Sequence, residues 1–372
     1  MTINPDPPIV GASLPRGDEP WQGRLNRAPA ERGRPRQLGR QLGRQLGRQL
    51  GRQLGRQLGR QLGRQLGRQL GCLLGCLLGC LLGCALGGCP RFEAGPVAYP
   101  APKERFVSVA GRRIHFVEQG KKDGPAVLFV HGFASSWVVW ERLMKDLGAT
   151  HRVVALDLPG FGYSDKRAGD YSPQGLGELL AAFMTARGME RAHLVAHSWG
   201  SSVALALAHR HPARVQSLTL MGAWIYDDQL APFQRWARAR GLGEALFAMF
   251  YKERVGDRMA LAFHDPDRYV THGFIGLVKA ALERPGAVAA ALAATRQQRL
   301  GELEEHYPRV KAPALLLWGR EDDVALLGFG ERLARDLPRA RLRVFARCGH
   351  FPMIEAYGAT LDALRDHLEA SR

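Results

Sequence analysis

The sequence predicts an α/β fold built on a parallel sheet, and two observations carry this prediction. From Arg105 onwards, short runs rich in β-branched residues alternate with longer amphipathic stretches, at the spacing of strand–helix–strand units. Residues 193–202, His-Leu-Val-Ala-His-Ser-Trp-Gly-Ser-Ser, form an apolar run that ends in a serine between small residues and continues as a helix. With 372 residues, the chain is long enough to bury a large core.

The expected elements follow in chain order. Gly111 marks a turn, and the residues around it predict a hairpin over 106–119. The next strands and helices share the buried or amphipathic pattern of a parallel sheet: strands over 126–130, 152–156, 193–196 and 215–221, and helices over 137–147, 173–187 and 201–211. Two further strands are expected over 315–318 and 341–345.

Ser198 has the surroundings of a nucleophile elbow, a sharp strand-to-helix turn that lifts a serine hydroxyl above the edge of the sheet. The strained backbone of such a turn tolerates only small residues two positions before and two positions after the serine. Ala196 and Gly200 meet that requirement, although the strict pattern has glycine at the first of these positions. Gly and Ser also simply start helices, so the elbow needs catalytic partners to support it.

Five motifs together resemble the α/β-hydrolase family over about residues 105–372. They are His131-Gly-Phe133, Asp157-Leu-Pro-Gly-Phe-Gly-Tyr-Ser164, Ala196-His-Ser-Trp-Gly200, Leu317-Trp-Gly-Arg-Glu-Asp-Asp323 and Gly349-His-Phe-Pro352. The resemblance implies a mostly parallel sheet with helices on both faces. It also implies a helical cap inserted after the strand that ends at Met221, and a catalytic Ser, Asp and His in that chain order.

The sequence has room for such a cap. No clear strand is expected between Gly222 and Tyr307, and helical stretches rich in Ala, Leu, Phe and Met are expected over 233–240, 244–252 and 274–283. Most of their apolar side chains should pack as ordinary core. Trp224, Phe247 and Phe250 are the candidates to line an apolar pocket over the serine. The expected division is 105–223 and 309–372 for the core and 224–308 for the cap.

His350 is the expected catalytic base. A serine hydroxyl is a poor nucleophile at neutral pH, so Ser198 needs a base within hydrogen-bond reach. His350 follows a predicted strand in a loop that carries Gly349 and Pro352. His197 is the other candidate, but adjacent side chains on an elbow diverge, so we expect it to lie behind the catalytic residues.

Asp322 is the expected acid of the triad, because the base needs a carboxylate that fixes its tautomer and stabilises the imidazolium. It lies in the loop just beyond the strand at 315–318, and the family position three residues after the glycine falls on it. Asp323 and Glu321 are close enough in sequence to remain alternatives.

The resemblance also assigns an oxyanion hole, the pair of backbone amides that stabilises the negative oxygen of the intermediate. These are the amides of Trp199, at the start of the elbow helix, and of Phe133. The side chain of Phe133 is expected only to pack. His131 is a candidate for the substrate pocket, but we expect it to hold its own loop.

The serine at position 198 separates this chain from neighbours of the same fold. Haloalkane dehalogenases and related epoxide hydrolases carry an aspartate there, so a different mechanism is predicted. Carbon–carbon bond hydrolases use serine but commonly carry a Gly-rich loop after the first His-Gly, which residues 133–136, Phe-Ala-Ser-Ser, lack. Hydrolysis of a carboxylic ester or thioester through an acyl-enzyme is the main expectation, with a small apolar acyl substrate. The alternatives are carbon–carbon bond hydrolysis and a non-catalytic binding protein of this fold.

Composition excludes several other classes. Most of the net charge of +17 belongs to the first 90 residues, which hold 14 arginines and four acidic residues, and no nucleic-acid-binding motif accompanies the rest. No P-loop or dinucleotide fingerprint is present, so no cofactor is expected. Five of the six cysteines lie in a repeat and Cys348 stands alone outside it, so no disulfide framework is expected.

Residues 1–90 form a low-complexity extension. Arg-Gln-Leu-Gly runs nine times over residues 36–71, and four units that begin with cysteine follow up to Gly87. A period of four drifts by about 40° per repeat around an α-helix, and each glycine costs about 1 kcal/mol relative to alanine. A disordered translated repeat that is dispensable for catalysis is the main interpretation.

The cysteine-rich end of the repeat leaves other interpretations open. Residues 70–89 are apolar with glycine at every fourth position over most of their length, so membrane attachment is the second interpretation. Leu86-Gly-Gly-Cys89 is similar to a lipoprotein processing site, but the charged region before it is far longer than that of a signal peptide. A metal site is the weakest interpretation, because no histidine accompanies the cysteines. A cytoplasmic location is expected, with membrane anchoring as the alternative.

Overall fold

The structure, a computed structural model, describes residues 105–372. The expected repeat extension over residues 1–90 and the candidate membrane segment over 70–89 lie outside these residues. Among the described helices, none combines the length and the apolar character needed to cross a bilayer.

Eight strands form a single sheet in the order β1-β2-β4-β3-β5-β6-β7-β8. The strands are β1 Arg105–Val109, β2 Arg112–Gly120, β3 Ala126–Val130, β4 Arg152–Leu156, β5 Ala192–His197, β6 Val215–Met221, β7 Ala314–Gly319 and β8 Ala340–Phe345. The last six strands in this order, β4-β3-β5-β6-β7-β8, pair in parallel. The β1–β2 and β2–β4 pairs are antiparallel. The predicted mostly parallel sheet is confirmed, and so is the hairpin around Gly111.

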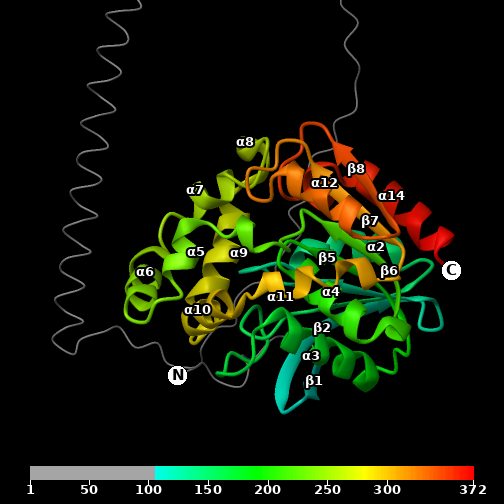
Figure 1. Cartoon of the computed structure of the whole chain (residues 1–372), viewed down its shortest axis with the longest axis horizontal. Helices are drawn as coiled ribbons and strands as arrows, with labels where there is room; N and C mark the ends of the chain where they lie inside the picture. The colour runs from blue at the N-terminus through cyan, green and yellow to red at the C-terminus, as the bar shows by residue number, and fades with distance from the viewer. Residues whose placement is uncertain (1–104) are drawn as a thin grey trace, which may run out of the picture. The chain divides into compact units, whose positions relative to one another are not determined.

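Helices cover both faces of the sheet because side chains alternate along each strand. On β3, Leu128 and Val130 belong to one apolar cluster, and Val127 and Phe129 belong to the other. The first cluster is covered by α3 Pro173–Ala186, α4 Gly200–Arg210 and α12 Leu327–Asp336; the second is covered by η1 Trp137–Trp140, α2 Glu141–Leu147, α13 Pro352–Glu355 and α14 Tyr357–Ala370. The buried side chains therefore form two clusters, one on each face of the sheet, and Figure 1 shows the helices packed around that sheet.

Between β6 and β7 the described chain forms helices and no strand, as expected. We call residues 227–304 the insert. Its elements are η3 Asp227–Gln229, α5 Pro232–Trp236, α6 Leu242–Phe250, α7 Val255–Ala260, α8 Pro266–Tyr269, α9 His272–Glu283, α10 Ala287–Gln297 and α11 Leu300–Glu304. Figure 1 shows most of these helices gathered beside the sheet, at the left of the view. Short η2 Pro212–Arg214 and η4 Tyr307–Arg309 complete the fold.

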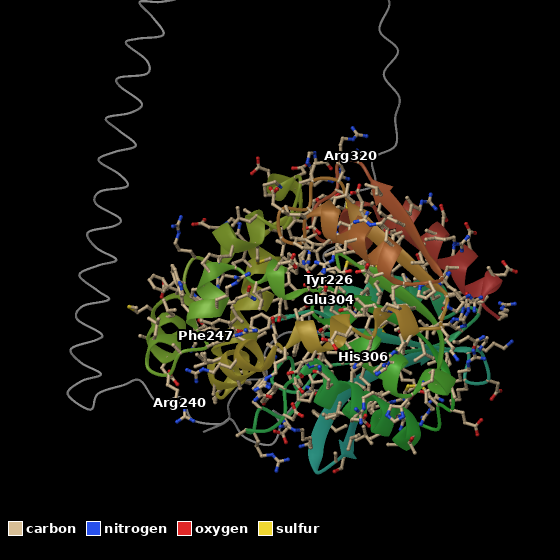
Figure 2. All side chains as sticks on the ribbon, viewed as in Figure 1. Tyr226, Arg240, Phe247, Glu304, His306 and Arg320 are labelled. Carbon is tan, nitrogen blue, oxygen red and sulfur yellow. The ribbon has the colours of Figure 1, made fainter. Side chains whose placement is uncertain are left out.

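One helix of the insert is shorter than the sequence predicts. The helix expected over 233–240 ends at Trp236, and turns follow up to Gly241. Gly241 has φ of +77°, which interrupts a right-handed helix before α6 begins. Arg240 therefore lies on an exposed turn at the outer end of the insert (Figure 2).

Candidate active site

Ser198 occupies a strained turn between β5 and α4. Its φ is +51°, a left-handed conformation that costs a non-glycine residue about 1–3 kcal/mol. Two backbone hydrogen bonds join the turn to the segment at the end of β6: the amide of Ser198 donates to the carbonyl of Met221 at 2.9 Å, and its carbonyl accepts from the amide of Trp224 at 3.1 Å. A Cβ on Gly200 would stand 2.4 Å from the carbonyl oxygen of His131, which explains why this position must be small. The backbone has the geometry of a nucleophile elbow.

His350 and Asp322 form a buried pair. The distance from Nδ1 of His350 to Oδ2 of Asp322 is 2.9 Å, and Oδ1 of Asp322 accepts from the amides of Val324 and Ala325. A Cβ on Gly222 would meet Nδ1 of His350 at 2.9 Å, so only glycine fits beside the pair. The carboxylate is thus held in place by backbone donors and turned towards the imidazole.

The two other acidic candidates have different positions. Asp323 lies on the wall of the cavity described below, whereas the Glu321 carboxylate accepts a hydrogen bond from the amide of Cys348 at 3.0 Å. Only Asp322 of the three contacts the His350 ring among the described contacts. The geometry therefore favours Asp322 as the triad acid.

His197 supports the loop of His350 from behind. Its Nε2 donates to the carbonyl oxygen of His350 at 2.8 Å, and the two ring centroids are 4.6 Å apart. Burial lowers the pKa of His197 well below its usual value, and the nearby His350 lowers it further. A neutral ring that donates through Nε2 is therefore the favoured state, and it positions the base.

Two backbone amides next to Ser198 are available to a ligand. Within residues 105–372, the amides of Phe133 and Trp199 donate to no other group. Trp199 precedes the first residue of α4, where the helix dipole favours negative charge. A Cβ on Gly132 would stand 2.9 Å from Cβ of Ser198, so the loop that carries Phe133 runs directly beside the serine. An oxyanion hole formed by these two amides stays a prediction.

His131 holds this loop and does not line the cavity. The amide of Leu158 donates to its Nε2 at 2.9 Å, so Nδ1 carries the proton and donates to the carbonyl of Gly132 at 2.8 Å. Burial lowers the pKa of His131, and nearby Asp157 only partly opposes this effect. The His131 ring is therefore neutral, and its hydrogen bonds connect the loops that follow β3 and β4.

A cavity of about 770 Å³ opens above Ser198, and His350 lies on its wall. Trp224 and Phe133 also line it, together with aliphatic residues of the insert. Its apolar lining agrees with a site that binds a largely apolar group and excludes water.

Two of the aromatic residues expected on the pocket wall occupy other places. Phe247 is 2% exposed and stacks between Phe233 and Tyr251, with ring centroids 5.6 and 5.1 Å away. It therefore belongs to the core of the insert (Figure 2). Phe250 is 38% exposed, and neither ring lines the cavity.

Two arginines on the cavity wall have no counterpart in the sequence-based expectations. They are Arg258 on α7 and Arg284 just after α9. The Arg284 guanidinium lies over the ring of Tyr163 at 3.7 Å from the centroid. Arginine is common across the chain, so no sequence signal distinguished these two from surface charges. Within the described residues, no cluster of three His, Cys, Asp or Glu side chains could hold a metal.

Comparison with known proteins gives the same fold. Residues 125–357 match the sequence profile of the alpha/beta hydrolase fold. The 2-hydroxymuconate semialdehyde hydrolase of Pseudomonas sp. (strain CF600) is 31% identical over 275 residues, which is 68% of this chain and 88% of that protein. The 2-hydroxy-6-oxo-2,4-heptadienoate hydrolase of Pseudomonas putida is 30% identical, over 66% of this chain and 90% of that protein.

Solved structures agree. The meta-cleavage product hydrolase from Pseudomonas fluorescens IP01 is similar with a TM-score of 0.62 and 25% identity, over 72% of this chain and 98% of that one. A bacterial membrane phospholipase A is similar with a TM-score of 0.58 and 27% identity, over 73% of this chain and 86% of that one. The sheet order, the strained serine turn and these matches lead to one conclusion: the chain belongs to the α/β-hydrolase family.

Proposed function

We propose that this protein is a serine hydrolase that cleaves the carbon–carbon bond next to the ketone or aldehyde of a 2-hydroxy-6-oxo-dienoate. The observation that carries the proposal is the similarity at 30–31% identity, over most of their length, to hydrolases of such compounds. The presence of both Ser198 and His350 on the wall of one cavity supports it. The proposal replaces the ester as the leading substrate class.

Each residue has a role in this reaction. Ser198 is the nucleophile. His350 takes the proton of the Ser198 hydroxyl, and Asp322 orients His350 and stabilises the imidazolium that forms. The amides of Phe133 and Trp199 stabilise the oxygen that becomes negative when the C6 carbonyl is attacked. Before the bond between C5 and C6 breaks, the proton of the C2 hydroxyl moves to C5, so that C2 becomes a ketone and C5 is saturated. The bond between C5 and C6 then breaks, and its electron pair passes through C3 and C4 to the C2 oxygen, which takes a proton. Water releases the acyl group from Ser198 as a carboxylic acid. In balance, the OH of water ends on C6 and its hydrogen on C5.

The substrate carboxylate is the reason to consider the cavity arginines. A buried anion needs a charged partner, and Arg258 and Arg284 are the arginines on the described cavity wall. Arginine binds a carboxylate through two parallel N–H donors. We therefore propose that Arg258 or Arg284 binds the substrate carboxylate, whereas Arg238 and Arg240, which do not line the cavity, take no part.

Ester hydrolysis is the second candidate. The loop after β3 reads Phe133-Ala-Ser-Ser136 and lacks the glycines common in carbon–carbon bond hydrolases. The similarity to a phospholipase A, which cleaves a carboxylic ester, favours the same alternative. Both reactions use the same nucleophile and base, so only the substrate distinguishes them.

The test measures both reactions with one purified protein. We expect 2-hydroxy-6-oxo-2,4-heptadienoate to be hydrolysed with a kcat/KM at least tenfold above that of the best p-nitrophenyl ester in a series of graded acyl length. Arg258→Gln or Arg284→Gln should lower kcat/KM for the dienoate by about tenfold and leave that for a neutral ester within twofold.

Arg240→Gln serves as the matched control, because Arg240 is exposed at the outer end of the insert (Figure 2). It should leave both reactions unchanged. Turnover of esters without turnover of the dienoate would reject the carbon–carbon proposal and leave the ester candidate. Absence of both reactions, with no labelling of Ser198 by a fluorophosphonate, would favour a binding protein.

A further inference from the structure

The loop that carries His350 is in direct contact with the insert. The amide of His350 donates to the carbonyl oxygen of Ala262 at 2.8 Å. A Cβ on Gly349 would stand 2.7 Å from the same carbonyl oxygen and 2.9 Å from the amide nitrogen of His264. The glycine therefore allows the insert segment 262–264 to approach the backbone of the candidate base closely.

Glu355, the last residue of α13, closes this contact from the other side. Its Oε1 accepts from the amide of Gly349 at 2.9 Å, and its Oε2 accepts from the amide of His264 at 2.7 Å. A single half-buried carboxylate thus joins the loop of the base to the insert. Burial raises the pKa of Glu355, while its hydrogen bonds from backbone amides oppose that effect.

A stack of aromatic rings provides a second link between the insert and the loop that carries His350. The ring of Phe263 lies 4.9 Å from that of Phe351 at an interplanar angle of 9°, and Phe351 lies 4.6 Å from the ring of His197. His197 in turn donates to the carbonyl of His350. The insert segment therefore reaches His350 through hydrogen bonds on one side and through aromatic packing on the other.

We propose that Glu355 is a positioning residue that couples the docking of the insert to the placement of His350. A carboxylate can accept from two amides at once, one on each oxygen, which an amide or hydroxyl side chain cannot do. Ala262 and Phe263 also line the cavity. A substrate that packs against them therefore contacts the insert segment 262–264, which is bonded to the loop of His350. The inference rests on the proposed role of His350 as the catalytic base.

Glu355→Gln tests the coupling with little change of shape. The glutamine oxygen accepts from one amide, while its NH₂ group faces the N–H of the other. We expect kcat per titrated active site to fall about tenfold, because small misplacements of catalytic groups have effects of this size or larger. KM should stay within twofold. The rate constant for fluorophosphonate labelling of Ser198 should fall by the same factor as kcat, since labelling also depends on the base.

Glu283→Gln on α9 is the matched control, because Glu283 is exposed and pairs only with Lys279 among the described ion pairs. It should change neither rate. Phe263→Leu is the second variant: it weakens the ring stack and leaves both Glu355 hydrogen bonds in place. We expect it to lower kcat and the labelling rate about threefold, and it carries the test if Glu355→Gln does not fold.

The outcomes separate the coupling from the proposed function. If wild-type Ser198 is labelled but both variants keep kcat and labelling within twofold while their Tm falls, Glu355 only stabilises the fold and the coupling is rejected. If wild-type protein is not labelled and hydrolyses neither the dienoate nor the esters, the proposed function fails first, and the coupling fails with it.

Discussion

His350–Asp322 and His115–Asp157 are two histidine–carboxylate pairs with nearly the same geometry and different surroundings. The distances from Nδ1 to the carboxylate are 2.9 and 2.8 Å, and all four side chains are buried. His350 lies on the cavity wall beside Ser198, whereas neither His115 nor Asp157 lines it. Their chemistry therefore differs although their hydrogen bonds do not.

Asp157, the carboxylate of the second pair, fixes two loops through hydrogen bonds from their backbone amides. Asp157 accepts from the amides of Trp137 and Tyr163, each at 2.8 Å, in addition to His115. Burial alone would raise the pKa of Asp157, but its hydrogen bond with His115 and other neighbours, including the amide of Tyr163, together keep the pKa below its usual value. A short contact between histidine and carboxylate thus indicates a candidate catalytic base only where the ring also lines a cavity that a nucleophile lines too.

The largest expected effect is the loss of kcat when the nucleophile or the base next to the cavity is replaced. Ser198→Ala and His350→Ala should each lower kcat by at least about 10³-fold, because nucleophile and base act as one unit. Their Tm should stay close to that of the wild type. Turnover and fluorophosphonate labelling of each variant provide the measurement. Full activity of either variant would reject the serine mechanism.

Asp322→Asn sharpens the comparison within the candidate catalytic pair of His350 and Asp322. The amide no longer stabilises the imidazolium and favours the wrong tautomer of His350, so kcat should fall by about 10³–10⁴-fold. Asp323→Asn is the matched control and should lower kcat less than threefold. Steady-state kinetics of both variants decide the question; a larger loss in Asp323→Asn would transfer the role of acid to that residue.

Asp157→Asn should act mainly on stability. Removing one charge from a fully buried pair that also holds two loops should lower the free energy of unfolding by about 3 kcal/mol. Chemical denaturation measures this loss. Activity per titrated active site should fall far less than in Asp322→Asn, and an equal loss of kcat in both variants would remove the distinction between the pairs.

The smallest expected effect concerns another buried histidine, His193, and depends on pH. Burial lowers the pKa of His193 to about 4, with His151 as a further cause, and its Nδ1 pairs with the hydroxyl of Ser217 at 2.8 Å instead of a carboxylate. The unfolded chain binds a proton near pH 6.5 and the folded chain does not until about pH 4. Stability should therefore fall as pH decreases through this window, by at most about 1.4 kcal/mol per pH unit for this group.

His193→Gln should remove that part of the slope. Urea denaturation at pH 7.5, 6.0 and 5.0 measures it. His211→Gln is the control, since His211 is partly exposed and pairs with Glu178. An unchanged slope in His193→Gln would mean that other buried histidines account for the acid lability.

The sheet was predictable from the sequence to within a residue or two. Strands expected over 126–130, 152–156 and 215–221 coincide with β3, β4 and β6. Buried parallel strands are continuous apolar runs bounded by turn residues, and such runs depend on local composition alone. Ser198 was predictable for the same reason, since the small residues around it reflect a local steric requirement.

The cavity wall was not predictable, because it is formed by residues distant in the chain. Phe247 and Trp224 are both aromatic residues of the expected cap, yet only Trp224 lines the cavity. The role of Glu355 was equally hidden, since its partners are backbone amides 6 and 91 positions away. Backbone groups carry no sequence signal, and any residue could have supplied them.

The sequence by itself determined the mostly parallel sheet, the serine elbow and the order of the candidate triad, because each depends on local patterns of apolarity, size and chain order. Only the tertiary structure shows that Asp322 contacts His350 while its acidic neighbours lie elsewhere, separates the histidine–carboxylate pair on the cavity wall from the buried one, and places Arg258 and Arg284 on that wall. These distinctions depend on which side chains meet across separate loops and on which of them reach a cavity. Packing of the whole domain sets both.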